Sequence, residues 1–158
     1  MVTIEALHTE LCALVKSVPA FADNGFSIFS DIDLPAMSAL QTLPLAGVMY
    51  DGALPMDRTR NASTPVSQGS QAHSLVTRQF TVIVAVSYQF TGQDDTKPQA
   101  TALLEQVCAT VMGYTGVNTR PWRFIMERPE TTESGDGLVF YSQVWQTDVV
   151  VKGISTHS

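Results

Sequence analysis

The sequence is poor in charged residues, and basic residues are the scarcer kind. Only 15% of the 158 residues are Asp, Glu, Lys or Arg, against about 25% in an ordinary globular domain, so uncharged polar residues must form much of the surface. Nine Lys and Arg stand against fifteen Asp and Glu, which gives a net charge of −6. Binding to free nucleic acid needs clustered Lys and Arg to contact the phosphates. The composition therefore argues against a nucleic-acid-binding protein.

Long apolar runs and closely spaced cysteines are also missing. A membrane-spanning helix needs about 20 consecutive apolar residues, and no segment approaches that length. The first residues lack the charged-then-apolar pattern of a secretory signal, so we expect a cytosolic protein without membrane contact. Cys12 and Cys108 are far apart and form no metal-binding motif. We expect both to be reduced and packed as small apolar residues.

The motifs that usually carry catalysis are absent as well. Neither glycine-rich spacing that cradles phosphates occurs, nor does the Gly-x-Ser-x-Gly turn of a serine nucleophile. A metal site needs clustered His and carboxylates, but His8, His73 and His157 are dispersed. Two groups of acids, Asp31 with Asp33 and Glu127 with Glu130 and Glu133, are better explained as solvated strand and turn residues than as a metal site or an acid–base pair. We predict no catalytic residue, no metal and no cofactor, and a protein that is not an enzyme.

The segment from Arg78 to Phe90 has the strongest pattern in the chain. Its even positions are large and β-prone, and its odd positions are smaller and mostly polar. This period of two is that of a strand with one buried face, because helical neighbours recur every three or four residues. We predict the central strand of a sheet, with these residues facing the core: Phe80, Val82, Val84, Val86, Tyr88 and Phe90.

Two amphipathic helices are predicted to cover this strand. Thr3 can cap the first, which has an apolar stripe and ends before Pro19. Asp95 or Thr96 can cap the second, which has Pro98 in its first turn and ends at Gly113, a residue suited to the position after a helix. Its predicted stripe includes Leu103, Leu104, Val107, Val111 and Met112.

Further strands are predicted on both sides of the second helix. The 43–52 segment begins at a proline and stops at Asp51-Gly52, and we expect it to pair antiparallel with the central strand. In the 122–128 strand we expect Trp122, Phe124 and Met126 on one face. The other expected strands span 26–32 and 138–152. The chain is therefore predicted to be one α+β domain, residues 1–158, with a mostly antiparallel β-sheet covered on one face by two α-helices.

Residues 53–77 lack any apolar period and are rich in Ser, Thr, Gln, Asn, Asp, Pro and Gly. Loops this long are uncommon in compact domains unless they are functional or disordered. We interpret the segment as an extended loop or arm that orders against a partner. Residues 153–158 are expected to be a frayed tail.

The order of these elements, with four sequence segments, resembles a known family. The segments are Leu-Pro-Leu-Ala-Gly-Val-Met-Tyr at 43–50, Arg-Gln-Phe-Thr-Val-Ile-Val-Ala-Val at 78–86, a helix over 102–113 with Leu-Leu-Glu-Gln-Val, and Gly-Leu-Val-Phe-Tyr-Ser-Gln-Val-Trp-Gln-Thr-Asp at 137–148. Together with the amphipathic N-terminal helix, this layout resembles the tail terminator, or tail completion, proteins of tailed bacteriophages.

The resemblance implies a structural role in the virion. Members of that family form a hexameric homo-oligomeric ring that caps the head-proximal end of the tail tube, stops tube polymerisation and provides the head–tail joining surface. The implied partners are further copies of the chain, the tail tube protein, and sheath and neck or connector proteins, with DNA only passing through the lumen. Assembly would occur in the cytoplasm of the bacterial host. Two alternatives remain: a neck or head–tail connector adaptor, and a small-ligand-binding or enzymatic α+β domain.

Two polar segments are the predicted contacts between subunits or with partners. The first is the 53–77 arm, with Asp57, Arg58 and Arg60. The second is the 130–137 turn, with Glu130, Glu133 and Asp136. Both predictions depend on the length and polarity of these segments.

Overall fold

The computed structural model describes residues 1–22, 25–28, 44–55, 73–87, 96–130 and 138–153, and it has the predicted α+β architecture. Five strands form one sheet in the order β1-β2-β3-β5-β4. Only β1 and β2 are parallel; the other neighbours are antiparallel. The elements are α1 (Ile4–Lys16), a short 3-10 helix η1 (Pro19–Phe21), β1 (Gly25–Ile28), β2 (Leu45–Pro55), β3 (His73–Ser87), α4 (Thr96–Val111), β4 (Arg123–Glu130) and β5 (Leu138–Lys152).

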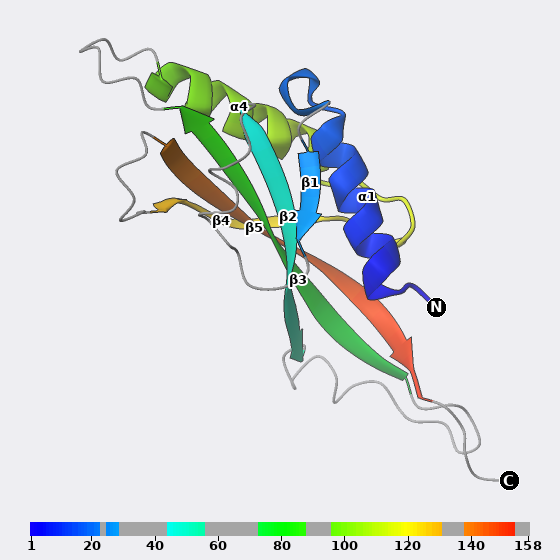
Figure 1. The fold of residues 1–158 in the computed structure, drawn as a ribbon. Coiled ribbons are helices and arrows are strands. Elements are labelled where there is room, and N and C mark those ends of the chain that lie inside the picture. The colour runs from blue at the N-terminus through cyan, green and yellow to red at the C-terminus, as the bar shows by residue number, and fades with distance from the viewer. Residues whose placement is uncertain (23–24, 29–43, 56–72, 88–95, 131–137, 154–158) are drawn as a thin grey trace, which may run out of the picture.

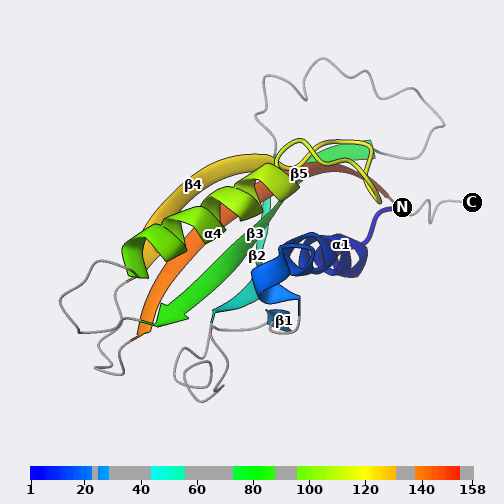
Figure 2. The same cartoon turned by 90° about the horizontal axis from the view of Figure 1, so that it is seen from above.

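Both helices lie on the same face of the sheet (Figures 1 and 2). The core forms between them and the even positions of β3, from Phe80 to Val86, as the alternation predicts. The odd positions Thr81, Ile83 and Ala85 are buried as well, so the strand does not have a single buried face. Trp122 and Trp145 are also buried in this core, where Trp122 meets the ring of Phe80 edge-on with centroids 5.5 Å apart. Both tryptophans therefore serve packing.

Local sequence explains where the helices begin and end. The Thr3 side chain accepts a hydrogen bond from the Ala6 amide, and α1 ends at Lys16, two residues before Val18-Pro19. The chain leaves α4 through Gly113, whose φ of +77° favours glycine. The predicted place of Met112 in the buried stripe is wrong: α4 ends at Val111, and Met112 is 56% exposed.

The segment predicted as a polar loop over 53–77 is strand at both ends. β2 continues to Pro55 and β3 begins at His73, so the 43–52 strand does not stop at Asp51-Gly52. The register shifts between Tyr50 and Gly52, and Gly52 has a φ of +114°, so a bulge lets the strand pass the expected turn. These strand ends lie away from the helices and pair through backbone hydrogen bonds, so they need no apolar period in their sequence. Residues 56–72 lie outside the described residues.

The prediction that Phe124 and Met126 share one face of β4 is wrong, because the strand contains a second bulge. Phe124 pairs with Trp145, but Met126 pairs with Val144, so the register shifts at Ile125 and Met126 turns to the opposite face from Phe124. The strand also runs to Glu130 and includes Pro129, which is tolerated because β4 is at the sheet edge. Glu130 therefore ends a strand and does not belong to a turn.

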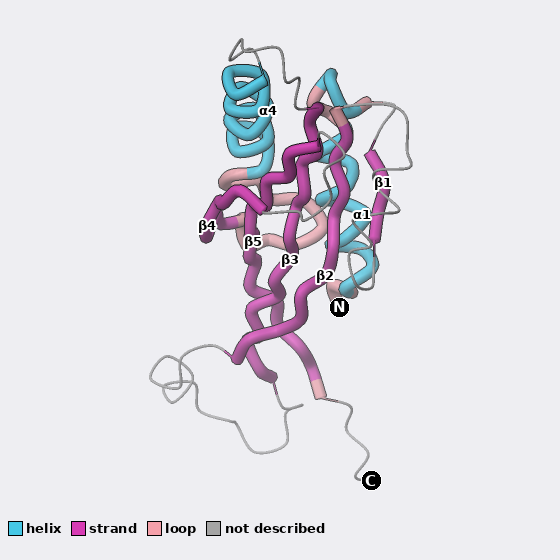
Figure 3. Tube along the Cα trace, turned by 60° about the vertical axis from the view of Figure 1, so that its left-hand side comes forward, coloured by secondary structure: helices cyan, strands magenta, loops and turns pink. Residues whose placement is uncertain are grey.

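The remaining strands agree with the sequence more closely. β5 spans Leu138–Lys152, as predicted, and β1 is a short edge strand within the expected 26–32 region, of which 29–32 lie outside the described residues. The ends of β2, β3 and β5 extend beyond the helices as a projecting ribbon (Figures 1 and 3). His73–Gln79 pairs there with Gln146–Lys152.

Candidate functional site

Of the six residues predicted to make subunit contacts, the structure describes one. Asp57, Arg58, Arg60, Glu133 and Asp136 lie outside the described residues. Glu130 accepts hydrogen bonds from the Ser142 hydroxyl at 2.7 Å and from Arg128 Nε at 2.9 Å. The bond from Ser142, and then Arg128, lowers the pKa of Glu130 below its ordinary value. This carboxylate is thus already paired within its own chain.

Polar pairs cross the sheet on the side opposite α1 and α4, which we call the second face. Gln146 donates to Gln79 at 2.8 Å, and the Thr81 hydroxyl donates to Asp51. Thr77 and Arg123 both bond to Asp148, and Ser142 and Arg128 both bond to Glu130. Among the described residues, no buried side-chain polar atom lacks a partner. A neighbouring subunit that covers this face would therefore leave few hydrogen-bonding groups without a partner.

A hollow of about 380 Å³ lies on the second face, over β2, β3, β5 and β4. Its charged residues are Asp51, Arg128 and Glu130, two acids and one base. The most exposed apolar side chain in it is Met126, at 44%. The lining is Met49, Asp51, Gln79, Thr81, Ile83, Met126, Arg128, Glu130, Ser142 and Val144.

The loop from Met112 to Trp122 has no helix or strand, but backbone hydrogen bonds hold its base and its interior. Backbone bonds join Gly113 N to Trp122 O at 2.9 Å and Trp122 N to Tyr114 O at 3.1 Å, which closes the loop at its base. Gly116 N donates to Asn118 O at 3.2 Å within it. Such internal bonding leaves the loop few alternative conformations.

Glu10 of α1 holds this loop against the helix side of the molecule. Its carboxylate accepts from Trp122 Nε1 at 3.0 Å and from the Val117 amide. A Cβ at Gly116 would collide with the same carboxylate and with the ring of Tyr114, so any larger residue there would displace Glu10 from its bonding position. The sequence analysis assigned no role to Glu10. Its partners are 107 and 112 residues away, and helix periodicity cannot reveal them.

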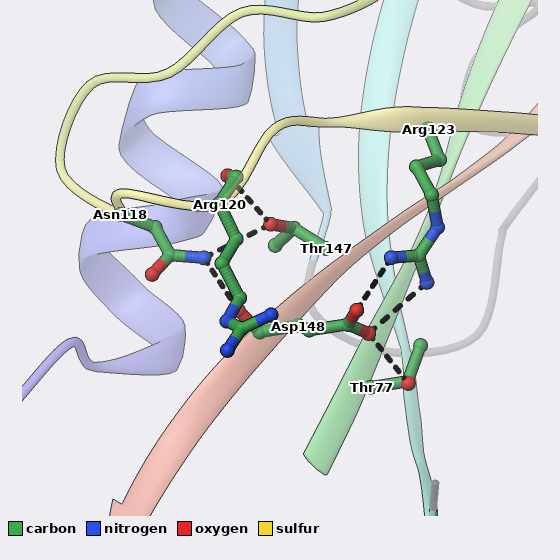
Figure 4. A network of polar contacts seen from close by, with 6 residues as sticks. All are labelled: Thr77, Asn118, Arg120, Arg123, Thr147 and Asp148. Carbon is green, nitrogen blue, oxygen red and sulfur yellow. Dashed lines mark hydrogen bonds and ion pairs between the residues drawn. The ribbon is translucent and has the colours of Figure 1, made fainter. Parts of the chain in front are cut away.

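A polar network fastens the other end of the loop to β5 (Figure 4). Asn118 Nδ2 donates to Thr147 Oγ1 at 3.0 Å and to Asp148 O at 2.7 Å, and Thr147 donates to Arg120 O at 3.1 Å. The Asp148 carboxylate binds Arg123 through both of its oxygens, with one contact at 3.0 Å. These bonds from Arg123 come first among the causes that lower the pKa of Asp148.

This anchored loop displays large apolar side chains to solvent. Met112, Tyr114 and Val117 are 56%, 41% and 50% exposed. Arg120 is the only charged residue between 112 and 122; it makes no close ion pair with a described residue, but its charge helps to lower the pKa of Asp148. A rigid loop that exposes apolar groups is suited to docking, because little conformational entropy is lost on binding.

The remaining candidates for chemistry among the described residues are histidine, cysteine and carboxylate side chains. No group of three or more His, Cys, Asp or Glu among them could hold a metal ion. His8 is buried in the core, with Nε2 3.1 Å from Val48 O. Both cysteines are free thiols, and burial raises the pKa of each, which disfavours the nucleophilic thiolate. No helix in the described part of the chain is long and apolar enough to cross a membrane.

Comparison with models of known protein families and with curated proteins finds no match to this chain. The geometry of its surfaces is therefore the basis for a functional proposal.

Proposed function

We propose that this chain is a structural protein of a tailed bacteriophage, a tail terminator that assembles into a hexameric ring on the head-proximal end of the tail tube. The ring would stop tube polymerisation and provide the surface to which the head joins. The sequence layout that resembles tail terminators motivates the family and the hexamer. The observation that carries a binding role, as opposed to a catalytic one, is the second face of the sheet.

The second face combines two properties that suit a subunit interface. Its polar side chains are bonded across strands, as with Thr77 to Asp148 and Gln146 to Gln79, so a covering neighbour need supply few new hydrogen bonds. Met126, which is 44% exposed, and the half-buried Met49 line the hollow and present apolar surface in the same region. Interfaces are formed by apolar centres whose polar groups are satisfied.

The low content of charged residues and the negative net charge also support an assembly role. A protein with 15% charged residues has a surface that neighbours can cover at a modest desolvation cost. A net charge of −6 suits a ring through which DNA slides, because a basic lumen would hold the phosphates. A positive potential measured along the inner wall of the ring would refute this last point.

The test is electron microscopy of particles from a phage that carries a stop codon at Tyr88 of this gene. Overlong tails without heads are expected, because the tube would grow without a cap. A synonymous change at the same codon is the matched control and should leave tail length unchanged. Tails of normal length beside separate full heads would instead identify a neck adaptor, and intact infectious particles would refute a role in the virion.

A further inference from the structure

We propose that, in the ring, the loop displaying Tyr114 and Val117 of one subunit inserts into the second-face hollow of the next copy of the same chain. This contact depends on the proposed ring function and specifies how its subunits join.

The loop already has a fixed conformation in the single subunit, before it contacts a partner. Its base is closed by the bonds between Gly113, Tyr114 and Trp122, and its tip is held by Glu10 through the Val117 amide. Three large apolar side chains are nevertheless exposed on it. Rigid aromatic and apolar anchors of this kind contribute a large share of interface energy.

The hollow offers the matching surface. Its volume of about 380 Å³ is within the range of about 300–1,000 Å³ that small-ligand sites occupy, enough for a few side chains. Met49, Met126 and Val144 supply apolar lining. Part of the polar lining is bonded within the chain, as with Ser142 and Arg128 to Glu130, so an apolar insert leaves these groups satisfied.

The charges of the two surfaces are complementary. The loop carries one charge, the cation Arg120, and the hollow carries two anions, Asp51 and Glu130, against one cation, Arg128, a sum of −1. Among the described residues, Glu130 is paired with the cation Arg128, whereas Asp51 accepts a hydrogen bond from the neutral Thr81. Arg120 of one subunit therefore faces Asp51 of the next. Complementary charges of this kind set orientation and register more than affinity.

The positions of the two surfaces identify a second copy as the occupant. The loop is fastened to α1 by Glu10 and so lies on the helix side, whereas the hollow lies on the second face. One chain thus carries both partners of a contact and presents them on opposite sides of its sheet. A contact between unlike surfaces of identical subunits is the kind that closes into a ring.

The experiment measures assembly of the purified full chain by sedimentation over a range of concentrations. We expect the unmodified chain to form a closed ring, and Tyr114→Ser and Met126→Ser each to raise the dissociation concentration about thirtyfold or more. Ile125→Ser is the matched control, since Ile125 neighbours Met126, is equally exposed at 44%, and does not line the hollow. All these residues are exposed, so the variants should keep the thermal midpoint of the unmodified chain.

A charge exchange then tests the pairing between subunits. Arg120→Glu and Asp51→Arg should each weaken assembly, and the double variant should restore it, because the pair re-forms with reversed signs. Lys16→Glu, another exposed basic residue, is the control and should have no effect. Rings that form equally well with Tyr114→Ser and Met126→Ser, or an unmodified chain that stays monomeric at its highest soluble concentration, would overturn the contact. The stop-codon phage tests the ring function separately, so failure of the contact and failure of the function are distinguishable.

Discussion

The two hydrogen bonds that the Glu10 carboxylate accepts from the 112–122 loop, which we call the clamp, give the sharpest test of this structure. Glu10→Ala removes one carboxylate that accepts from two donors, Trp122 Nε1 at 3.0 Å and the Val117 amide. Trp122 is buried, whereas Val117 is exposed. We therefore expect the two lost bonds to differ in cost, because water can replace the acceptor only at Val117.

The expected loss of stability follows from these two bonds. A hydrogen bond to a charged group contributes about 1.5–3 kcal/mol, and a buried donor left unpaired costs about 1–3 kcal/mol. With the exposed bond counted at about 1.5 kcal/mol and the unpaired donor at about 1–3 kcal/mol, Glu10→Ala should lower the free energy of unfolding by about 2.5–4.5 kcal/mol. For a chain of 158 residues, this corresponds to a fall in the thermal midpoint of about 5–18 °C, at about 2–4 °C per kcal/mol.

Calorimetry measures the midpoint, and amide hydrogen exchange locates the change. Exchange should accelerate at Gly113, Gly116, Val117 and Trp122 while the β3 amides stay protected. Glu5→Ala, which truncates another glutamate of the same helix, is the control and should cost less than 1 kcal/mol, about the effect of one charge near a helix end. A midpoint within 2 °C of the unmodified chain, with unchanged exchange in the loop, would refute the clamp.

Three further predictions concern other contacts that stabilise the folded chain, at Asp148, Gly116 and Gln143. Asp148→Asn should lower the free energy of unfolding at neutral pH by about 1–2 kcal/mol. Folding lowers the pKa of Asp148, so the ionised carboxylate stabilises the fold above its unfolded pKa of about 3.9, and this stabilisation is lost as pH falls through the folded pKa. Acid unfolding curves of the variant should therefore be shallower below pH ~4, and equal slopes would contradict this. Gly116→Ala should destabilise the loop, because the methyl group meets Glu10; pairing it with Glu10→Ala should recover part of the loss in a thermal melt, and strictly additive losses would count against this contact. Gln143→Ala should lower the free energy of unfolding by about 2–4 kcal/mol, since Gln143 is fully buried and donates to Leu104 O at 3.0 Å; chemical denaturation measures this, and a loss below 1 kcal/mol would show that the bond contributes little.

Much of the fold was predictable because its signals are local. The alternation from Phe80 to Val86 identifies the central strand and its core face, since a strand's side chains have a period of two wherever the strand lies. Thr3 and Gly113 mark helix ends for similar reasons: capping and positive φ depend on a few neighbouring residues. The apolar stripes of the helices then require a common sheet face to cover.

The errors fall where a partner strand decides the geometry. Pairing with β3 carries β2 through Asp51-Gly52 to Pro55, although the dipeptide alone favours a turn. Pairing with β5 places a bulge at Ile125, which turns Met126 away from Phe124 and onto the second face. A bulge depends on how many residues oppose one another across two strands, and one strand's own pattern does not contain that count.

An α+β domain with two helices on one face of a sheet could be predicted from the sequence, because burial periodicity and capping are properties of short segments. The surfaces proposed to join the subunits are visible only in the folded chain. Glu10 meets Val117 across 107 residues, and Thr77 meets Asp148 across 71. The reason is physical: such hydrogen bonds form between residues distant in sequence, so their partners are set by packing of the whole chain and not by any local pattern.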